Sequence, residues 1–279
     1  MSKSGLLRDT TDKFYTCDKS VRLCIQAFVD SLEISKDDTC IEPSAGDGAF
    51  ITSIKEIFNH YAFYDIKPEN KEIITQDFLE LDTNLFQNKC GRIHILGNPP
   101  FGRQSSLAIK FIKHCALFAD TISFVLPRSF RKESMKRHFP RQFHLLCDID
   151  MPCDSFTIEN KTHNVPCIFQ VWQKQDAPRA LAVKSDPIGY MFVKQDDHHD
   201  IAIRRVGVYA GSIYRETANK SPQSHYFIRF TMQNKEKIYL SLLEKLTKIE
   251  YPTKDNTVGP RSISKGDIVT EFNKIVTQY

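Results

Sequence analysis

A glycine-containing segment after the first apolar run is the part of the sequence best suited to hold a small ligand. In IEPSAGDGAF, residues 41–50, Gly46 and Gly48 lie between a predicted strand and a predicted helix. Glycines in such a turn let the backbone approach a ligand closely. The turn lacks the third glycine of a dinucleotide-binding fingerprint, and the acid Glu42 would repel a pyrophosphate. The segment therefore favours a cationic or zwitterionic ligand over NAD.

Acidic residues follow the next two predicted strands, where a nucleoside would need them. Asp65 ends the segment AFYD, and Asp77 follows a third strand with Phe78 beside it. An acid about 20 residues beyond the glycine turn is placed to accept the ribose hydroxyls. A carboxylate can also accept a hydrogen bond from an adenine amino group while an aromatic ring stacks on the base. Acids at successive strand tips thus favour a nucleoside-binding edge.

The segment NPPF, residues 98–101, closes the predicted strand HILG and is suited to bind a planar amine. Neither proline has an N–H group, so strand pairing ends there, and Pro100 holds Pro99 in an extended conformation. The Asn98 side-chain oxygen and the Pro99 carbonyl would then be two acceptors on a rigid elbow beside the flat ring of Phe101. Two acceptors suit an –NH2 group, such as the exocyclic amine of a base.

Together, IEPSAGDGAF and NPPF resemble the class I S-adenosylmethionine-dependent amino-methyltransferases of the N6-adenine type. The upstream Phe14-Tyr15-Thr16 is similar to an additional N-terminal motif of that family, and the order of the three motifs is that of the gamma group of DNA adenine methyltransferases. The resemblance covers residues 13–174. It implies S-adenosyl-L-methionine as cofactor and methyl transfer to the N6 amine of adenine in nucleic acid, with DNA favoured.

The resemblance also implies a role for each matching residue. The cofactor would be surrounded by Phe14, Tyr15 and Thr16 at its methionine end, by Glu42, Pro43, Gly46 and Gly48 in the loop, by Asp65 at the ribose, and by Asp77 and Phe78 at the adenine. The target base would be held by Asn98, Pro99 and Phe101 and stacked by Phe156, which precedes a late predicted strand.

Other substrates remain open. The DNA enzymes of this family usually carry a large recognition domain after the catalytic core, whereas only residues 176–279 follow it here. NPPF also occurs in enzymes that methylate adenine in RNA, and the related NPPY serves glutamine methylation in release factors. The alternatives are an RNA adenine N6-methyltransferase acting on rRNA, tRNA or cap-proximal mRNA, then a protein glutamine methyltransferase or an inactive binding subunit. The intact NPPF argues against the last.

Positive charge is concentrated after the fifth predicted strand. Residues 103–143 contain nine Lys and Arg but only two acidic residues. Standing alone, such a cluster is usually a solvated helix face. Beside a motif that binds a base it predicts a phosphate-binding surface. The residues expected to contribute are Arg128, Arg131, Lys132 and Lys136.

Short apolar runs alternate with amphipathic segments over the first two thirds of the chain, which predicts an α/β fold with a doubly wound, Rossmann-like methyltransferase sheet. The predicted strands are 39–43, 61–64, 72–74, 93–96, 121–126, 145–149 and 165–172, and the predicted helices are 20–32, 49–58, 105–118 and 129–138. These elements place the motifs at the carboxyl ends of successive strands, which meet at one edge of a parallel sheet.

A polar stretch, residues 173–188, predicts a boundary between a methyltransferase domain, 1–175, and a small accessory or substrate-recognition module, 176–279. The module is expected to be α+β. Its predicted strands are 190–193, 201–206 and 226–231, and its predicted helices are 234–249 and 264–276. Ser264 and Asp267 form a possible capping box at the start of the last helix.

Composition limits the class of protein. The 279 residues are 41% hydrophobic and 26% charged, with a formal net charge of +4 and a mean hydropathy of −0.37. No apolar run is long enough to span a membrane, and the polar N-terminus favours an intracellular protein of the cytoplasm or nucleus with reduced cysteines. The sequence contains no C-x-x-C pair of the kind that indicates a metal site. The oligomeric state does not follow from the sequence.

Overall fold

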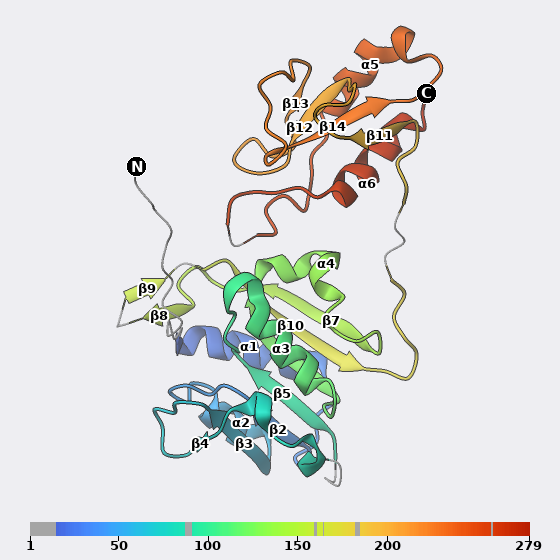
Figure 1. The fold of residues 1–279 in the computed structure, drawn as a ribbon. Helices are drawn as coiled ribbons and strands as arrows, with labels where there is room; N and C mark the ends of the chain where they lie inside the picture. Colours follow the sequence, from blue (N-terminus) through green and yellow to red (C-terminus); the bar gives the residue numbers. More distant parts are fainter. Residues whose placement is uncertain (1–14, 87–90, 159–160, 164, 182–184, 258) are drawn as a thin grey trace. The chain divides into compact units, whose positions relative to one another are not determined.

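The chain divides into two compact units. The computed structural model describes residues 15–279 except 87–90, 159–160, 164, 182–184 and 258 (Figure 1). Unit 1 is Met1–Leu181 and unit 2 is Ala182–Tyr279. The division falls within the polar stretch 173–188 that indicates a boundary in the sequence.

Unit 1 is built on a seven-stranded sheet of order β4-β3-β2-β5-β6-β10-β7 among the described residues. Its strands are β2 (Thr39–Glu42), β3 (His60–Asp65), β4 (Ile74–Thr75), β5 (Ile93–Gly97), β6 (Thr121–Pro127), β7 (Phe143–Asp150) and β10 (Cys167–Lys174). Strands β2 to β6 are parallel, and β10 runs antiparallel to β6 and β7. The strand order reverses between β2 and β5, where ligands bind in such sheets. The predicted α/β fold class is confirmed.

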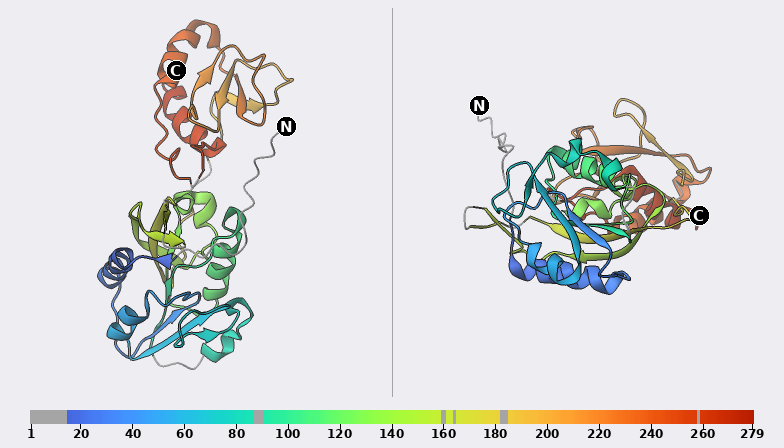
Figure 2. Two further views of the ribbon diagram at one scale, coloured as in Figure 1. Left: turned by 90° about the vertical axis from the view of Figure 1, so that its left-hand side faces the viewer. Right: turned by 90° about the horizontal axis from the view of Figure 1, so that it is seen from below.

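Helices cover both faces of this sheet because alternate residues of each buried strand point to opposite faces. Helices α1 (Asp18–Ser31) and α2 (Ile51–Ile57) lie on one face, and α3 (Ser106–Cys115) lies on the other (Figure 2). In β2, Cys40 packs in the core cluster of α1, and the next residue, Ile41, packs in that of α3. The sheet thus separates two cores and leaves its strand ends for the site.

The predicted helix 129–138 is wrong as a single element. The segment instead forms the 3-10 helix η4 (Arg128–Arg131) and the one-turn helix α4 (Glu133–Lys136), with Lys132 extended between them. The fully buried rings of Phe130 and Phe139 anchor the two ends in the core and force the chain to follow the sheet. The Arg179 guanidinium donates to the carbonyls of Lys136 and Phe139 at 2.8 and 3.0 Å, which satisfies the end of α4.

A small sheet that the sequence does not predict joins the N-terminus to the later part of unit 1. It has the order β1-β8-β9, with β1 (Tyr15–Thr16), β8 (Phe156–Ile158) and β9 (Lys161–His163). Tyr15 pairs with Thr157, and Thr16 pairs with Phe156. Strands of two or three residues are too short to show a period of two. Their pairing fixes the N-terminal motif beside the main sheet.

Unit 2 is an antiparallel sheet of order β11-β14-β12-β13 with two helices. Its elements are β11 (Tyr190–Val193), β12 (Ile201–Arg204), β13 (Ile213–Tyr214), β14 (His225–Phe230), α5 (Lys235–Thr247) and α6 (Lys265–Val276). Its core joins buried side chains of the sheet, such as Ile203 and Ile228, to Leu242 of α5 and Phe272 of α6. The predicted capping box at Ser264 is confirmed. Of the described residues, no helix is long and apolar enough to cross a membrane.

Candidate functional site

The glycine loop after β2 is held in a fixed conformation by its neighbours. The Gly46 N–H donates to the Asp65 carboxylate at 2.9 Å, and the Gly46 carbonyl accepts from the Glu69 N–H at 2.9 Å. Gly46 and Gly48 have φ of 57° and 92°, in the left-handed region that favours glycine. A Cβ at Gly48 would also lie 2.6 Å from Ile51 Cδ1. Both glycines are therefore required for the path of this loop.

Asp65, at the end of β3, ties the glycine loop to the sheet. Its carboxylate accepts from the Gly46 N–H at 2.9 Å and from the Lys67 N–H at 2.8 Å, and the residue is buried. Each carboxylate oxygen can accept a second bond, so the ribose role stays a prediction. Ile66, which follows Asp65, is an exposed apolar residue at the same strand end, with 69% of its surface accessible.

Glu42, at the end of β2, is a buried acid with spare bonding capacity. It is 2% exposed, and its Oε2 atom has no hydrogen-bond partner among the residues that the structure describes. Burial raises the pKa of Glu42 well above its usual value, and the charges of Asp47 and Asp65 raise it further. The side chain lies against Gly97, where a Cβ would come within 3.1 Å of Glu42 Cγ. A buried carboxyl group without a partner is stabilised by a hydrogen-bond donor, and a cationic donor would best offset the energetic cost of burying the charge.

Asn98 lies next to the glycine loop, at the end of β5. Its side-chain nitrogen donates to the Thr16 hydroxyl at 3.3 Å, and its backbone carbonyl accepts from the Ser44 hydroxyl at 3.2 Å. Thr16 is buried and Asn98 is half-buried. The structure therefore brings together the N-terminal motif, the glycine loop and NPPF, as the sequence predicts.

Tyr15 lies over the glycine loop. Its ring is 3.9 Å from the position of a Cβ on Gly46, and its hydroxyl donates to the Glu69 carboxylate at 2.5 Å. Burial and the bond to Glu69 raise the pKa of Tyr15 to about 12, so the phenol is neutral at physiological pH. Phe14, the first residue of the motif, lies outside the described residues.

A strained turn follows the last residues of NPPF, Pro99 to Phe101. Pro99 is buried, Phe101 is half-buried, and the Phe101 carbonyl accepts from the Leu107 N–H at 3.1 Å in α3. Gln104 and Ser105 follow with φ of 53° and 62°. Positive φ at two successive non-glycine residues costs about 1–3 kcal/mol each and is concentrated at functional sites. Sequence reasoning gave no signal for this strain.

The prediction that Phe78 stacks on the cofactor adenine is not supported. Phe78 is 1% exposed and packs against Phe111, with ring centroids 6.1 Å apart, and against His114 at 5.4 Å. The ring offers no face to a ligand because it fills the core beneath the strand ends. Asp77 is half-buried and caps the 3-10 helix η1 (Phe78–Glu80) by accepting from the Leu79 N–H at 3.0 Å.

The prediction that Phe156 stacks on the target base is not supported either. Phe156 pairs with Thr16 in the small sheet and is 1% exposed. Its ring lies in the core cluster of α1, together with Phe28 and Met151. The pairing of β8 with β1 turns this side chain inward, and no sequence pattern in so short a strand shows that.

The basic segment is partly neutralised by β7. Arg128 pairs with Asp150 at 2.7 Å, and Arg131 pairs with Asp148 at 2.6 Å and with Asp150 at 2.9 Å. Burial alone would raise the pKa of Asp150, but Arg131 and Arg128 hold it below its usual value. These acids lie beyond the basic run in the sequence, yet their spacing of two in a strand indicates one shared face.

Lys136 pairs with the exposed Glu133 at 3.0 Å. Such surface pairs contribute little to stability, so Lys136 remains available to a phosphate. The four predicted phosphate-binding residues therefore differ in how readily they could bind a phosphate, because Arg128 and Arg131 would first have to separate from their carboxylate partners. The role of Lys132 stays a prediction.

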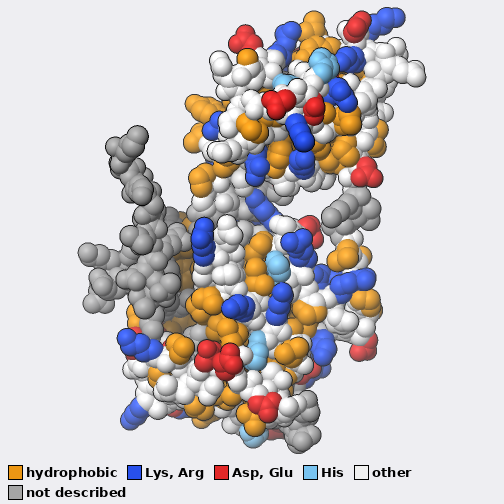
Figure 3. Space-filling view, viewed as in Figure 1, with side chains coloured by type: hydrophobic (Ala, Val, Ile, Leu, Met, Phe, Trp, Pro, Cys, Tyr) orange, Lys and Arg blue, Asp and Glu red, His pale blue; other side chains and the backbone are white. Residues whose placement is uncertain are grey.

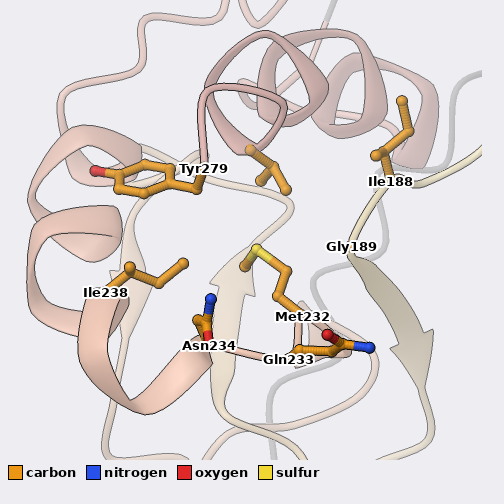
Figure 4. Close-up of a pocket in the computed structure, with 8 residues that line it drawn as sticks. Ile188, Gly189, Met232, Gln233, Asn234, Ile238 and Tyr279 are labelled. Atoms are coloured by element: carbon orange, nitrogen blue, oxygen red, sulfur yellow. The ribbon is translucent and has the colours of Figure 1, made fainter.

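A hollow of about 310 Å³ lies in unit 2, between the start of β11, the start of α5 and the end of α6 (Figure 4). Gly189, Met232 and Tyr279 are among the residues that line it, and none of its lining residues is a candidate site residue. In the described part of the chain, no three His, Cys, Asp or Glu side chains gather where they could hold a metal ion.

No family model matches the sequence, and no curated protein matches it. Solved structures are similar to part of the chain. A candidate RNA methyltransferase from Pyrococcus horikoshii is 14% identical, with a TM-score of 0.42 over 60% of this chain and 88% of that chain.

A candidate class I S-adenosylmethionine-dependent methyltransferase from Listeria monocytogenes is 12% identical, with a TM-score of 0.45 over 64% and 66% of the two chains. A candidate methyltransferase from Streptococcus mutans, in complex with SAH, is 11% identical, with a TM-score of 0.35 over 56% and 95%. These similar structures are described as methyltransferases. Because their sequence identities and TM-scores are low, the activity is inferred from the residues of the site.

Proposed function

We propose that this chain transfers a methyl group from S-adenosyl-L-methionine to the exocyclic N6 amine of adenine in nucleic acid, DNA foremost. The observation that carries the proposal is the placement of Asn98. Its amide is bonded to Thr16 and its carbonyl to Ser44 of the glycine loop. A group suited to bind an amine thus lies beside a loop suited to bind a nucleoside, at the switch point of the sheet.

The residues at the strand ends fit the cofactor. Glu42 offers an unpartnered buried oxygen to the α-ammonium group, which would supply the missing donor and the compensating charge. Gly46 and Gly48 leave the loop without side chains that would obstruct the approach of a ligand. Tyr15 would border the methionine end, and Asp65 and Asp77 would face the ribose and the adenine. The cofactor supplies an electrophilic methyl group on a sulfonium.

The substrate amine needs activation because its lone pair is delocalised into the purine ring. The Asn98 side-chain oxygen and the Pro99 carbonyl would accept the two amine hydrogens and localise that lone pair on nitrogen. The Asn98 amide nitrogen donates to the Thr16 hydroxyl, and we assign the amide oxygen to the substrate amine. Phe101 would stack on the base, and stacking is worth about 1–3 kcal/mol per base. Alignment and oriented acceptors would therefore supply most of the catalysis.

Unit 1 holds every residue named in this mechanism, so we propose it as the methyltransferase domain and unit 2 as an accessory module for substrate recognition. A base inside a duplex would first have to be extruded. Of the predicted phosphate-binding residues, we assign Lys136 to a flanking phosphate, because its partner Glu133 is exposed, whereas Arg128 and Arg131 are paired with carboxylates of β7.

The proposal is tested by methyl transfer from a tritiated cofactor to duplex DNA, single-stranded DNA, RNA and protein, with the modified nucleoside or residue identified. We expect N6-methyladenine. A matched substrate in which purine replaces adenine lacks the 6-amino group and should accept no methyl group. Methylation of glutamine, or of the adenine-free substrate, would contradict the proposal.

A further inference from the structure

The excess of positive charge lies wholly in unit 2. Unit 1 has 23 Lys and Arg and 23 Asp and Glu, whereas unit 2 has 15 and 11. The net charge of +4 thus comes from the smaller unit. Figure 3 shows Lys and Arg side chains of unit 2 among hydrophobic ones on the face in view. Excess positive charge on an accessory module indicates an anionic partner.

Backbone hydrogen bonds bring two segments of unit 2 together. Val206, just after β12, forms an antiparallel bridge with Ser262. The Gly207 N–H donates to the Arg261 carbonyl, and the Ile263 N–H donates to the Arg205 carbonyl, both at 2.9 Å. The end of β12 and the start of α6 therefore form one edge of the unit.

A tight loop, residues 207–211, presents an aromatic ring at this edge. Gly207 and Gly211 have φ of 95° and 99°, and the Gly211 N–H donates to the Arg204 carbonyl at 2.8 Å, which closes the loop. Tyr209 at its tip is 69% exposed, and its neighbour Val208 is 77% exposed. A closed loop that holds an aromatic ring in solvent is suited to stack on a planar partner.

Two cations at the same edge lie against aromatic rings. The Arg205 guanidinium lies 5.0 Å from the centre of the Tyr226 ring, and the Lys265 ammonium lies 4.8 Å from that of Phe192 and 5.8 Å from that of Tyr226. In the part of the chain that the structure describes, neither forms an ion pair with a carboxylate. By contrast, Arg261 beside them pairs with Asp255 at 2.7 Å. The rings position the two charges without neutralising them.

We propose that Arg205, Lys265 and Tyr209, called here the unit 2 patch, bind single-stranded nucleic acid. Arg205 and Lys265 would contact successive phosphates, and Tyr209 would stack on an unpaired base, a combination that suits single strands of any sequence. A paired base presents only its edges, so the exposed ring favours a single strand over a duplex. The inference deepens the proposed function and rests on it for the nature of the ligand.

The test measures binding of the full chain to a labelled single-stranded oligonucleotide by fluorescence anisotropy over a series of salt concentrations. The double variant Arg205→Gln/Lys265→Gln should reduce the log–log salt slope by about 1.4, because each lost contact to a single strand removes about 0.7. Tyr209→Ala should weaken binding about 5- to 150-fold through lost stacking. Tyr209→Phe should bind as the wild type does.

The matched control is Lys245→Gln/Lys248→Gln, which removes the same charge from α5, where Lys248 pairs with Glu244. It should leave the slope nearly unchanged. An equal effect of this control, or unchanged binding in the patch variants, would overturn the proposal. So would a patch-dependent binding to anionic lipid vesicles with no effect on the oligonucleotide.

The outcome is separate from that of the proposed function. If N6-methyladenine forms but the patch variants bind normally, only the patch assignment fails. If the patch variants lose binding but no N6-methyladenine forms with any substrate, the patch stands and the proposed function fails.

Discussion

Replacing Asp65 by Ala should loosen the glycine loop and weaken cofactor binding together. The carboxylate accepts from the N–H groups of Gly46 and Lys67 at 2.9 and 2.8 Å, and the residue is buried. An unsatisfied buried donor costs about 1–3 kcal/mol; because both donors here are only partly buried, the loss of the two bonds should lower the free energy of unfolding by about 2–4 kcal/mol. At about 2–4 °C per kcal/mol for a domain of this size, we expect the Tm to fall by about 4–16 °C.

Calorimetric titration with S-adenosylhomocysteine should show at least a tenfold weaker affinity for Asp65→Ala, since the Gly46 turn is no longer fixed. Asp65→Asn is the matched control, because its amide oxygen still accepts one of the two bonds, and it should lie between the wild type and Ala in both Tm and affinity. A Tm and an affinity equal to those of the wild type would refute the role assigned to Asp65.

Three further predictions follow from other parts of unit 1. Phe101→Ala should weaken capture of the target base about 5- to 150-fold through lost stacking, whereas Phe101→Tyr should be nearly neutral; single-turnover rates at increasing substrate concentration give both values, and equal capture by Ala would contradict the stacking role. Burial lowers the pKa of His94 despite its bond to Asp38, and backbone bonds from Ser35 and Arg92 hold the pKa of Asp38 low although burial opposes them. The folded state thus binds fewer protons than the unfolded chain below about pH 6.5, so the free energy of unfolding should decrease as the pH falls through that value. His94→Gln should make the denaturant midpoint depend less steeply on pH, and a midpoint that is constant between about pH 7 and 5 would argue against this prediction. Arg131→Gln should destabilise unit 1 by about 1–3 kcal/mol because it leaves Asp148 and Asp150 without this partner. Lys136→Gln should change stability little but reduce the salt slope of nucleic-acid binding by about 0.7–0.9. Thermal melts and salt titrations of both variants test these roles, and a lower salt slope for Arg131→Gln in place of Lys136→Gln would contradict them.

The sequence predicts the main sheet and the strand-end residues because both depend on local signals. Strands buried on both faces are continuous apolar runs, and their order follows from the alternation with helices. The turns at Gly46 and at Asn98 are marked by glycine and proline, whose backbone restrictions are visible without a structure. These signals suffice to place Glu42, Asp65 and Asn98 at one edge.

The remaining features depend on contacts between distant parts of the chain. A phenylalanine beside a strand end has the same sequence signature whether it faces a ligand or the core, and Phe78 and Phe156 are both buried. Charges in a cluster are counted along the chain, but Arg131 is neutralised by β7, which lies beyond the cluster. The pairing of Thr16 with Phe156 joins short strands that have no period of their own.

The central claim is that Asn98 binds the amine that receives the methyl group. The most direct test is single-turnover methyl transfer by Asn98→Ala to an adenine-containing oligonucleotide, with the affinity for S-adenosylhomocysteine measured on the same protein. The predicted result is unchanged affinity and transfer at least about 10²-fold slower, the scale of losing one preorganised polar group from an active site. Asn98→Asp should transfer faster than Ala, since a carboxylate still accepts from the amine. Transfer by Asn98→Ala at the wild-type rate would contradict the account, because NPPF would then be only the turn that ends β5.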